Sequence, residues 1–512
     1  MTTEDIPLIC GNPGMVDGAS GSPATFSMFA LPFAYRGELR EEERGTGPRF
    51  VPETIGKEDH RWKYFTVESA KSLFEQARHY VLDEIRRCDR GFTFSRGGRC
   101  LSIHLAPPRL VLFPGRQDSS EADPLRIGFL IVMLYFTAPS DEPVYLDDLL
   151  ALNELYRYCR EPYPGHREHG YKYALEKDIA GLKDIYAGRW LRWLRNAPGL
   201  HVEADDLTAC GDNRAFVWTC AVLNKGSTTV RESFASTGDT ATAFKDFELS
   251  CWIKLLNVDK PGGTALLGND YEREWAKKRT YVRWEAYGSL YGIHFHGGAM
   301  MGPPNAELHL WRHFMGIYFD QTLLLLYLRI ALFQFSERLS AISSTAYKSG
   351  RILPNFHNSE IDITEEEKKQ QWRREFQELR WSFALFSNVY GFPLLSNQQQ
   401  GIELYTLARE HMDVRELFEQ VRQSIHDSHE YLQVESESKQ TETTTRLTVV
   451  ASIGLAFSVA AGILGMNMFD KENLQGLGTG IIIFFVLLGV CLRGLDVVAK
   501  NYSKLMRHLD TE

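Results

Sequence analysis

The strongest constraint on this chain is an uncharged run near its C-terminal end. Residues 447–469, LTVVASIGLAFSVAAGILGMNMF, carry no charged side chain over 23 positions. A helix rises about 1.5 Å per residue, so a helix of this length crosses the roughly 30 Å hydrocarbon core of a bilayer. The sequence therefore predicts a first transmembrane helix over 447–469.

A second uncharged run follows after a short polar turn. The turn DKENLQ covers 470–475, and GLGTGIIIFFVLLGVCL covers 476–492, which meets the lower limit of about 17 residues for a span. Lys439 and Arg446 precede the first run, and the basic tail at 493–512 follows the second. Because Lys and Arg mark cytoplasmic flanks, we expect a multi-pass protein of the inner or plasma membrane, with an external turn and both termini cytoplasmic.

Two other apolar stretches are better explained by a protein core. IGFLIVMLYFTA, residues 127–138, is too short to span as a helix and has the composition of a fully buried strand. Residues 314–339 are interrupted by Asp320, Arg329 and Glu337, which a lipid-facing helix would bury at several kcal/mol each. This second stretch is predicted to be a long, mostly buried helix outside the membrane.

The remainder divides by pattern into four segments. Residues 1–60 begin with a Gly-, Pro- and Ser-rich stretch and are expected to form a loop-rich arm. Over 61–304, short apolar runs (RLVLFPG, IGFLIVMLYF, AFVWTCAVLN and ELSCWIKLLN) alternate with helical patterns (YLDDLLALNELYRYCR and LKDIYAGRWLRWLR), which predicts a cytosolic α/β domain. Residues 305–412 have the pattern of a helical cytosolic region, and 413–446 that of a stalk helix.

The stalk is predicted to run unbroken into the membrane. No Pro or Gly occurs from Asp413 until Gly454, so one helix of about 50 residues and about 75 Å is expected. Its first part carries a seam of apolar residues at steps of three, four or seven, which predicts packing against copies or neighbouring helices: Val414, Phe418, Val421, Ile425 and Leu432. The polar continuation ESESKQTETTT either lines water or forms a solvated linker.

Charge and cysteine usage exclude several classes of protein. The formal net charge is −9, which offers no basic surplus for a nucleic-acid backbone, so no direct nucleic-acid partner is predicted. The eight cysteines include no C-x-x-C pair and are interpreted as reduced thiols. No P-loop or G-x-G-x-x-G motif and no nucleophile pattern is found, so no enzymatic activity is predicted.

The C-terminal layout resembles the CorA family of divalent-cation channels. The shared features are a cytosolic domain, a stalk helix, two closely spaced spans and a Gly-Met-Asn signature at the end of the first span, here Gly465, Met466 and Asn467. Other residues of the first run also agree with that family's helix: Leu447, Thr448, Ala461, Gly462 and Ile463. The chain departs from the pattern at Leu464, where an aromatic residue is usual, and at Ala456, where proline is common.

The resemblance implies a homopentameric funnel that carries Mg²⁺ or a related divalent cation such as Co²⁺ across a lipid bilayer. The first span would face the pore with Ser458, Leu455, Leu447, Thr444 and Thr441, and the two leucines would form a hydrophobic constriction. Ordinary lipid-facing or packing leucines are the alternative. The resemblance also implies that divalent ions bound by cytosolic carboxylates hold the closed state, for which Glu430 and Asp427 are the candidates.

The asparagine of the signature has a physical role in this scheme. Mg²⁺ gives up its inner waters reluctantly, so a ring of amide oxygens can select the hydrated ion by accepting hydrogen bonds from those waters. Gly465 would let the helices approach closely, and Met466 would orient Asn467. The competing interpretation is a helix C-cap, because Gly and Asn favour the left-handed conformation that ends helices.

Three alternatives remain open at the level of sequence. A Zn²⁺ exporter with the same signature is one. The enlarged cytosolic part also resembles that expected of CorA-like effectors of type III CRISPR defence, which would respond to a small nucleotide messenger. Finally, His294 and His296 in HFHGG share one face if they lie on a strand and could form a metal pair, although ordinary surface or core histidines are commoner.

Overall fold

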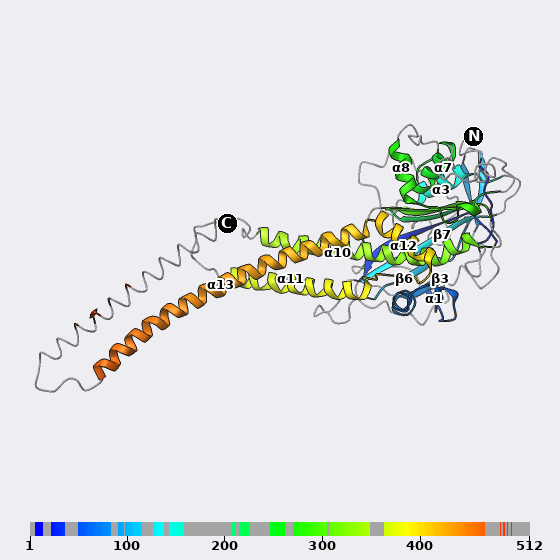
Figure 1. Cartoon of the computed structure of the whole chain (residues 1–512). Helices are drawn as coiled ribbons and strands as arrows, with labels where there is room; N and C mark the ends of the chain where they lie inside the picture. Colours follow the sequence, from blue (N-terminus) through cyan, green and yellow to red (C-terminus); the bar gives the residue numbers. More distant parts are fainter. Residues whose placement is uncertain are drawn as a thin grey trace, which may run out of the picture. The chain divides into compact units, whose positions relative to one another are not determined.

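The structure is a computed structural model of the whole chain (Figure 1). It describes residues 6–13, 22–35, 50–82, 91–96, 98–114, 126–137, 143–157, 194, 207–210, 214–224, 246–261, 270–304, 308–348 and 363–465, with 482, 485, 486, 489 and 493. By its internal contacts the chain divides into two compact units, Met1–Arg422 and Gln423–Glu512.

The first unit is built on a large mixed sheet. Its strands are β1 Phe26–Tyr35, β2 Phe50–Pro52, β3 Arg78–Leu82, β4 Gly91–Arg96, β5 Arg99–Leu105, β6 Arg109–Leu112, β7 Arg126–Phe136, β8 Leu207–Ala209, β9 Phe216–Val222, β10 Thr280–Tyr281, β11 Leu290–His294 and β12 Gly297–Gly302. The order along the main path is β10-β11-β12-β9-β1-β7-β6-β3-β2, with β4 and β5 attached beside β7 and β8 beside β1.

Helices precede, connect and follow these strands. They are α1 His60–Tyr64, α2 Val67–Lys71, α3 Leu146–Tyr156, α7 Asp246–Asn257, α8 Asp270–Arg279, α9 Leu310–His313, α10 Phe319–Lys348, α11 Ile363–Tyr390, α12 Gln399–His411 and α13 Val414–Gly465, with the π-helical turns η2 Ser72–Gln76 and η6 Phe314–Tyr318 and the 3-10 turn η5 Glu285–Tyr287.

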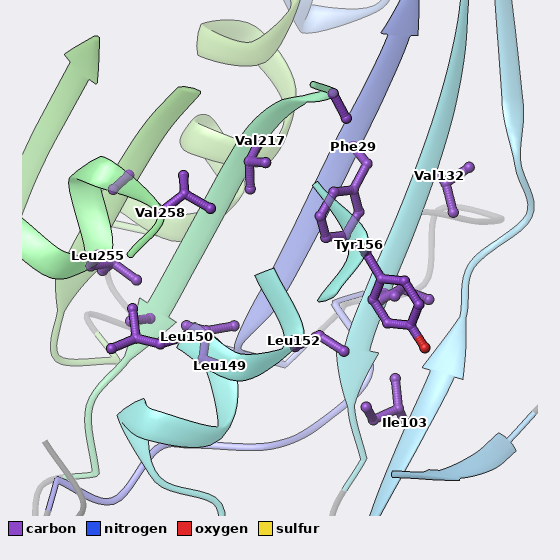
Figure 2. Close-up of a cluster of buried hydrophobic side chains, with 14 of the residues drawn as sticks. Phe29, Ile103, Val132, Leu149, Leu150, Leu152, Tyr156, Val217, Leu255 and Val258 are labelled. Atoms are coloured by element: carbon purple, nitrogen blue, oxygen red, sulfur yellow. The ribbon is translucent and has the colours of Figure 1, made fainter. Parts of the chain in front are cut away.

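Helices cover both faces of the sheet, with α3, α7 and α8 on one side and α10 and α12 on the other (Figure 1). Alternate residues of a strand therefore enter different cores. On β9, Val217 belongs to the cluster formed with α3 and α7, in which Phe29 and Tyr156 meet edge to face at 6.1 Å (Figure 2). Its neighbour Trp218 stacks on Phe314 of η6 on the opposite side, with ring centroids 4.1 Å apart.

This double coverage explains the continuous apolar run of β7. Ten of its residues pair with β1 in an antiparallel ladder from Phe26↔Tyr135 to Tyr35↔Arg126, and the strand is buried along nearly its whole length. The prediction of a buried core strand over 127–138 is confirmed for 127–136. The pairing is not that of a parallel α/β sheet, however, because among the described strands only β9 and β12 pair in parallel.

The expectation of a loop-rich arm over 1–60 is wrong for Phe26–Tyr35 and Phe50–Pro52, which are strands. β1 lies in the middle of the sheet between β7 and β9, and β2 lies at one end of it. Even Leu8 is held by its neighbours, since its amide donates to Val144 O at 2.8 Å. The prediction was based on the Gly- and Ser-rich residues before Phe26 and overlooked the ten-residue apolar strand FSMFALPFAY that follows them.

One apolar run has a different secondary structure from the one predicted. ELSCWIKLLN was predicted as a strand, but Asp246–Asn257 is the helix α7. Its buried residues include the i, i+4 pairs Cys251 with Leu255 and Trp252 with Leu256. Trp252 Nε1 donates a hydrogen bond to Thr280 Oγ1, at the start of β10, at 2.8 Å. The run RLVLFPG forms β6, AFVWTCAVLN forms β9 and YLDDLLALNELYRYCR forms α3, as predicted, whereas LKDIYAGRWLRWLR lies outside the described residues apart from Leu194.

The long apolar stretch at 314–339 is a core helix, as predicted. Over the described residues, Leu310–Ser344 is the one helix with the length and composition of a membrane span, and 89% of its most apolar window is buried inside the protein. Asp320 in this helix is buried and paired with Arg61 of α1 at 3.4 Å. The helical region 305–412 thus belongs to the same compact unit as the sheet rather than to a separate domain.

Candidate functional site

The candidate site is carried by α13, the longest described helix. Val414–Gly465 is continuous over 52 residues, so the predicted stalk and the described part of the apolar run at 447–469 form one unbroken helix. Asp413 precedes it with φ 56°, and the Asp413 carbonyl accepts the first helical hydrogen bond from Leu417 N at 3.0 Å. The left-handed backbone of Asp413 separates α13 from α12, so the helix begins one residue after the predicted position.

The apolar seam lies on one side of the first turns. Val414, Val421 and Ile425 are each at most 4% exposed. The Phe418 ring lies 5.6 Å from Phe383 of α11. This part of the seam therefore packs against α11 of the same chain.

The five predicted pore positions share one face of α13. At roughly 100° per residue, Thr441, Thr444, Leu447, Leu455 and Ser458 fall within an arc of about 120°. All five are exposed in the single chain, with Leu447 at 64% and Leu455 at 69%. The face is thus available to water, lipid or another copy of the chain.

A ladder of hydroxyl groups overlaps this face, and Thr445, Thr448 and Ser452 were not among the predicted positions. Five side chains donate to the backbone carbonyl four residues earlier at 2.7–2.8 Å: Thr441, Thr444, Thr445, Thr448 and Ser452. Their positions fall within about 100° of arc at the same helical step. The signal was present in the sequence as hydroxyl residues at steps of three and four.

The hydrogen bonds of the ladder determine whether these hydroxyls can donate to a solute or accept from it. Each hydroxyl has one proton and two acceptor lone pairs, and the helix backbone takes the proton. What remains is a row of oxygen acceptors. The waters of a hydrated cation point their protons outward, so this row matches them.

The predicted regulatory carboxylates lie on exposed turns of the same helix. Glu430 and Asp427 are three residues apart and exposed, and Asp427 Oδ1 accepts from Gln423 Nε2 at 2.5 Å. Among the described residues no group of three or more His, Cys, Asp or Glu side chains gathers to hold a metal. One chain therefore supplies at most a pair of carboxylates here, and further oxygen ligands for Mg²⁺ would have to come from other copies or from water.

The signature itself is only partly described. Gly465 is the last residue of α13, and Met466 and Asn467 lie outside the described residues, as does the turn 470–475. In the second predicted span, 476–492, the described side chains of Ile482, Phe485 and Val486 are each at least 60% exposed.

The histidines of HFHGG form part of a hairpin rather than a gathered metal site. His294 ends β11, and its Nδ1 accepts from the His296 amide at 3.3 Å across the turn to β12. Burial, together with the nearby cationic groups, lowers the pKa of His294 to about 3, so its ring is neutral at pH 7. No third ligand joins the pair among the described residues.

Comparison with protein-family models and with curated proteins gives no match to this chain.

Proposed function

We propose that this chain is one subunit of a CorA-like homopentameric channel for Mg²⁺ or a related divalent cation. The observation that carries the proposal is α13, in which one continuous helix bears a row of hydroxyl oxygens and then exposed leucines. In a ring of copies the hydroxyls and the two leucines would face the ion path, and the other apolar residues of the predicted span would meet lipid and neighbouring copies.

The polar ladder suits a hydrated ion. Mg²⁺ keeps its inner waters, and neutral hydroxyl oxygens accept from those waters without trapping the ion as carboxylates would. Leu447 and Leu455 on the same face would close the path by excluding water. Gly465, Met466 and Asn467 would form the external entrance, and the protein would lie in the inner or plasma membrane with both termini cytoplasmic.

Mg²⁺ is proposed both as cargo and as regulator. Asp427 and Glu430 from adjacent copies would repel each other until a cation bridges them, which favours one arrangement of the stalks when Mg²⁺ is abundant. This role requires the oligomer, because a single chain brings too few ligands together.

The test is ion flux through the purified protein in liposomes. An internal Mg²⁺-sensitive dye should report influx for the natural chain and none for Asn467→Ala, whereas Asn473→Ala, in the predicted turn, should conduct normally. Undiminished influx with Asn467→Ala would remove the proposed entrance. Parallel liposomes with a Zn²⁺ dye and an imposed pH gradient distinguish this function from that of a Zn²⁺ exporter.

A further inference from the structure

Basic side chains gather around the hairpin between β11 and β12, in the first unit. The ring of Trp275, on α8, lies 6.2 Å from the ring of His294, and the Arg279 guanidinium lies 4.6 Å from the centroid of the Trp275 ring. From α10, buried Arg329 donates to the Phe295 carbonyl, and its guanidinium lies over the Phe295 ring at 4.3 Å. Two guanidinium groups are therefore held beside this hairpin.

His294 provides a buried donor in the same cluster. Its side chain is 5% exposed, and its Nδ1 accepts from the His296 amide at 3.3 Å. The ring is neutral at pH 7, so its single proton lies on Nε2. Nε2 is buried and has no hydrogen-bond partner among the described residues. A buried N–H group without an acceptor costs free energy, which an acceptor placed there recovers.

The charge around this donor is positive. Burial lowers the pKa of His294, and nearby basic groups add to this effect: His296, Arg279, Arg329 and Arg157. Arg279 donates to the Trp275 carbonyl at 3.3 Å and pairs with no carboxylate of the described residues. Burial also lowers the pKa of Arg279, and nearby Glu410 and Asp413 do not offset this effect. The Arg279 guanidinium is therefore a partly buried cation without a carboxylate in contact.

These properties favour an anion over a metal cation at the histidines of HFHGG. A metal ion needs a bare ring nitrogen, but Nδ1 of His294 already accepts from His296 and Nε2 carries the proton. The neighbouring guanidinium groups also repel a metal ion. An anion, in contrast, accepts from the N–H group and is attracted by the same cations.

We propose that one small inorganic anion of the chloride type binds between His294 Nε2 and the Arg279 guanidinium. The rings of Trp275 and His294 are already close, which leaves space for a monatomic ion rather than for a large one. Trp275 and Arg279 are only half-buried, so the ion enters from solvent on their side. Because α8 packs against β11, the bound ion joins these two elements.

Binding can be measured by thermal unfolding of the full chain in detergent, with chloride replacing gluconate at constant ionic strength. The unfolding temperature of the natural chain should rise with chloride and reach a plateau, because the ion binds only the folded state. Arg279→Gln should raise the half-saturating chloride concentration about tenfold, since it removes a charge-assisted hydrogen bond. His294→Leu should abolish the response. His294→Gln keeps both an acceptor and an N–H donor and should recover part of it.

Lys277→Gln is the matched control, because Lys277 is an exposed cation on the same helix. It should respond to chloride as the natural chain does. Equal losses with Lys277→Gln and Arg279→Gln would mean diffuse charge attraction and would overturn the proposal. A response without a plateau, or one that Arg279→Gln leaves unchanged, would be a general salt effect and would also overturn it.

The width of the chlorine NMR line of the bulk ion gives a second measurement that does not depend on unfolding. The natural chain should broaden this line, and Arg279→Gln should broaden it less. Arg279 is half-buried, so its variant should keep the fold even where His294→Leu does not. Neither measurement involves cation flux, so their outcome is independent of the proposed channel function.

Discussion

At the start of β12, two glycines allow this strand to lie close to β9. Gly297 pairs in parallel with Val217, and a Cβ added to Gly297 would lie 2.3 Å from the Val217 carbonyl oxygen. A Cβ on Gly298 would lie 2.1 Å from the Trp218 ring. Close backbone packing therefore explains the two glycines of HFHGG.

Gly297→Ala should destabilise the protein, because the clash is with backbone that cannot rotate away. We expect a loss of roughly 1–3 kcal/mol, the usual cost of overpacking. Thermal unfolding of the full chain, followed by tryptophan fluorescence, measures it. Gly316→Ala is the control, since a Cβ there meets nothing within 4 Å, and similar losses in both variants would contradict this account.

At the scale of the element, continuity is the main property of α13. Hydrogen bonds between side chains four residues apart support it, among them Gln433 Nε2 to Glu437 Oε1 at 2.9 Å. An unbroken helix transmits a displacement along its length without a separate linkage, provided that no residue interrupts its backbone bonds. Glu437 lies between the apolar seam and the predicted span, which makes it a suitable position for an interruption.

Glu437→Pro should uncouple regulation from conduction. Proline removes one backbone donor and kinks the helix at a cost of about 3 kcal/mol, while the contacts proposed to assemble the oligomer would lie on either side of it. In liposomes, flux should persist and no longer respond to Mg²⁺ on the cytosolic side. Glu437→Ala removes the same carboxylate but keeps the helix and should respond normally. A normal Mg²⁺ response in the proline variant would show that α13 is not the coupling element.

At the scale of the whole molecule, a single chain leaves apolar side chains uncovered. Leu447, Val450 and Leu455 are each at least 64% exposed, and Phe485 is 63% exposed. Exposed apolar clusters of this kind mark contacts with membranes or other chains. Two spans from one chain also cannot enclose a water-filled path, so the proposed function requires several copies.

The purified protein should therefore behave as a pentamer. Light scattering in detergent, corrected for bound detergent, should give a protein mass of about five chains of 58.5 kDa each. Leu455→Asp should reduce this mass or the yield in membranes, because it would bring one carboxylate from each copy together at the proposed constriction, whereas Tyr431→Asp, at an exposed position before the predicted span, should not. A monomer for the natural chain would contradict the ring.

The sequence by itself determined the elements whose patterns are local. The absence of Pro and Gly from Asp413 until Gly454 predicted α13, the interrupting charges excluded a lipid-facing helix at 314–339, and the continuous apolar run predicted β7. The candidate pore positions on α13 came from the resemblance to the CorA family, and the geometry of a continuous helix places them on one face. These properties depend on a residue and its near neighbours.

Only the tertiary structure decided which elements meet. The central place of β1, the helical state of Asp246–Asn257 and the contact of Arg329 with the Phe295 carbonyl all depend on contacts between residues far apart in the chain. Short apolar runs suit a buried strand and a buried helix equally well, and packing selects between them. His294 shows the same limit, since its unsatisfied Nε2 arises from burial within the folded unit, which no spacing in the sequence encodes.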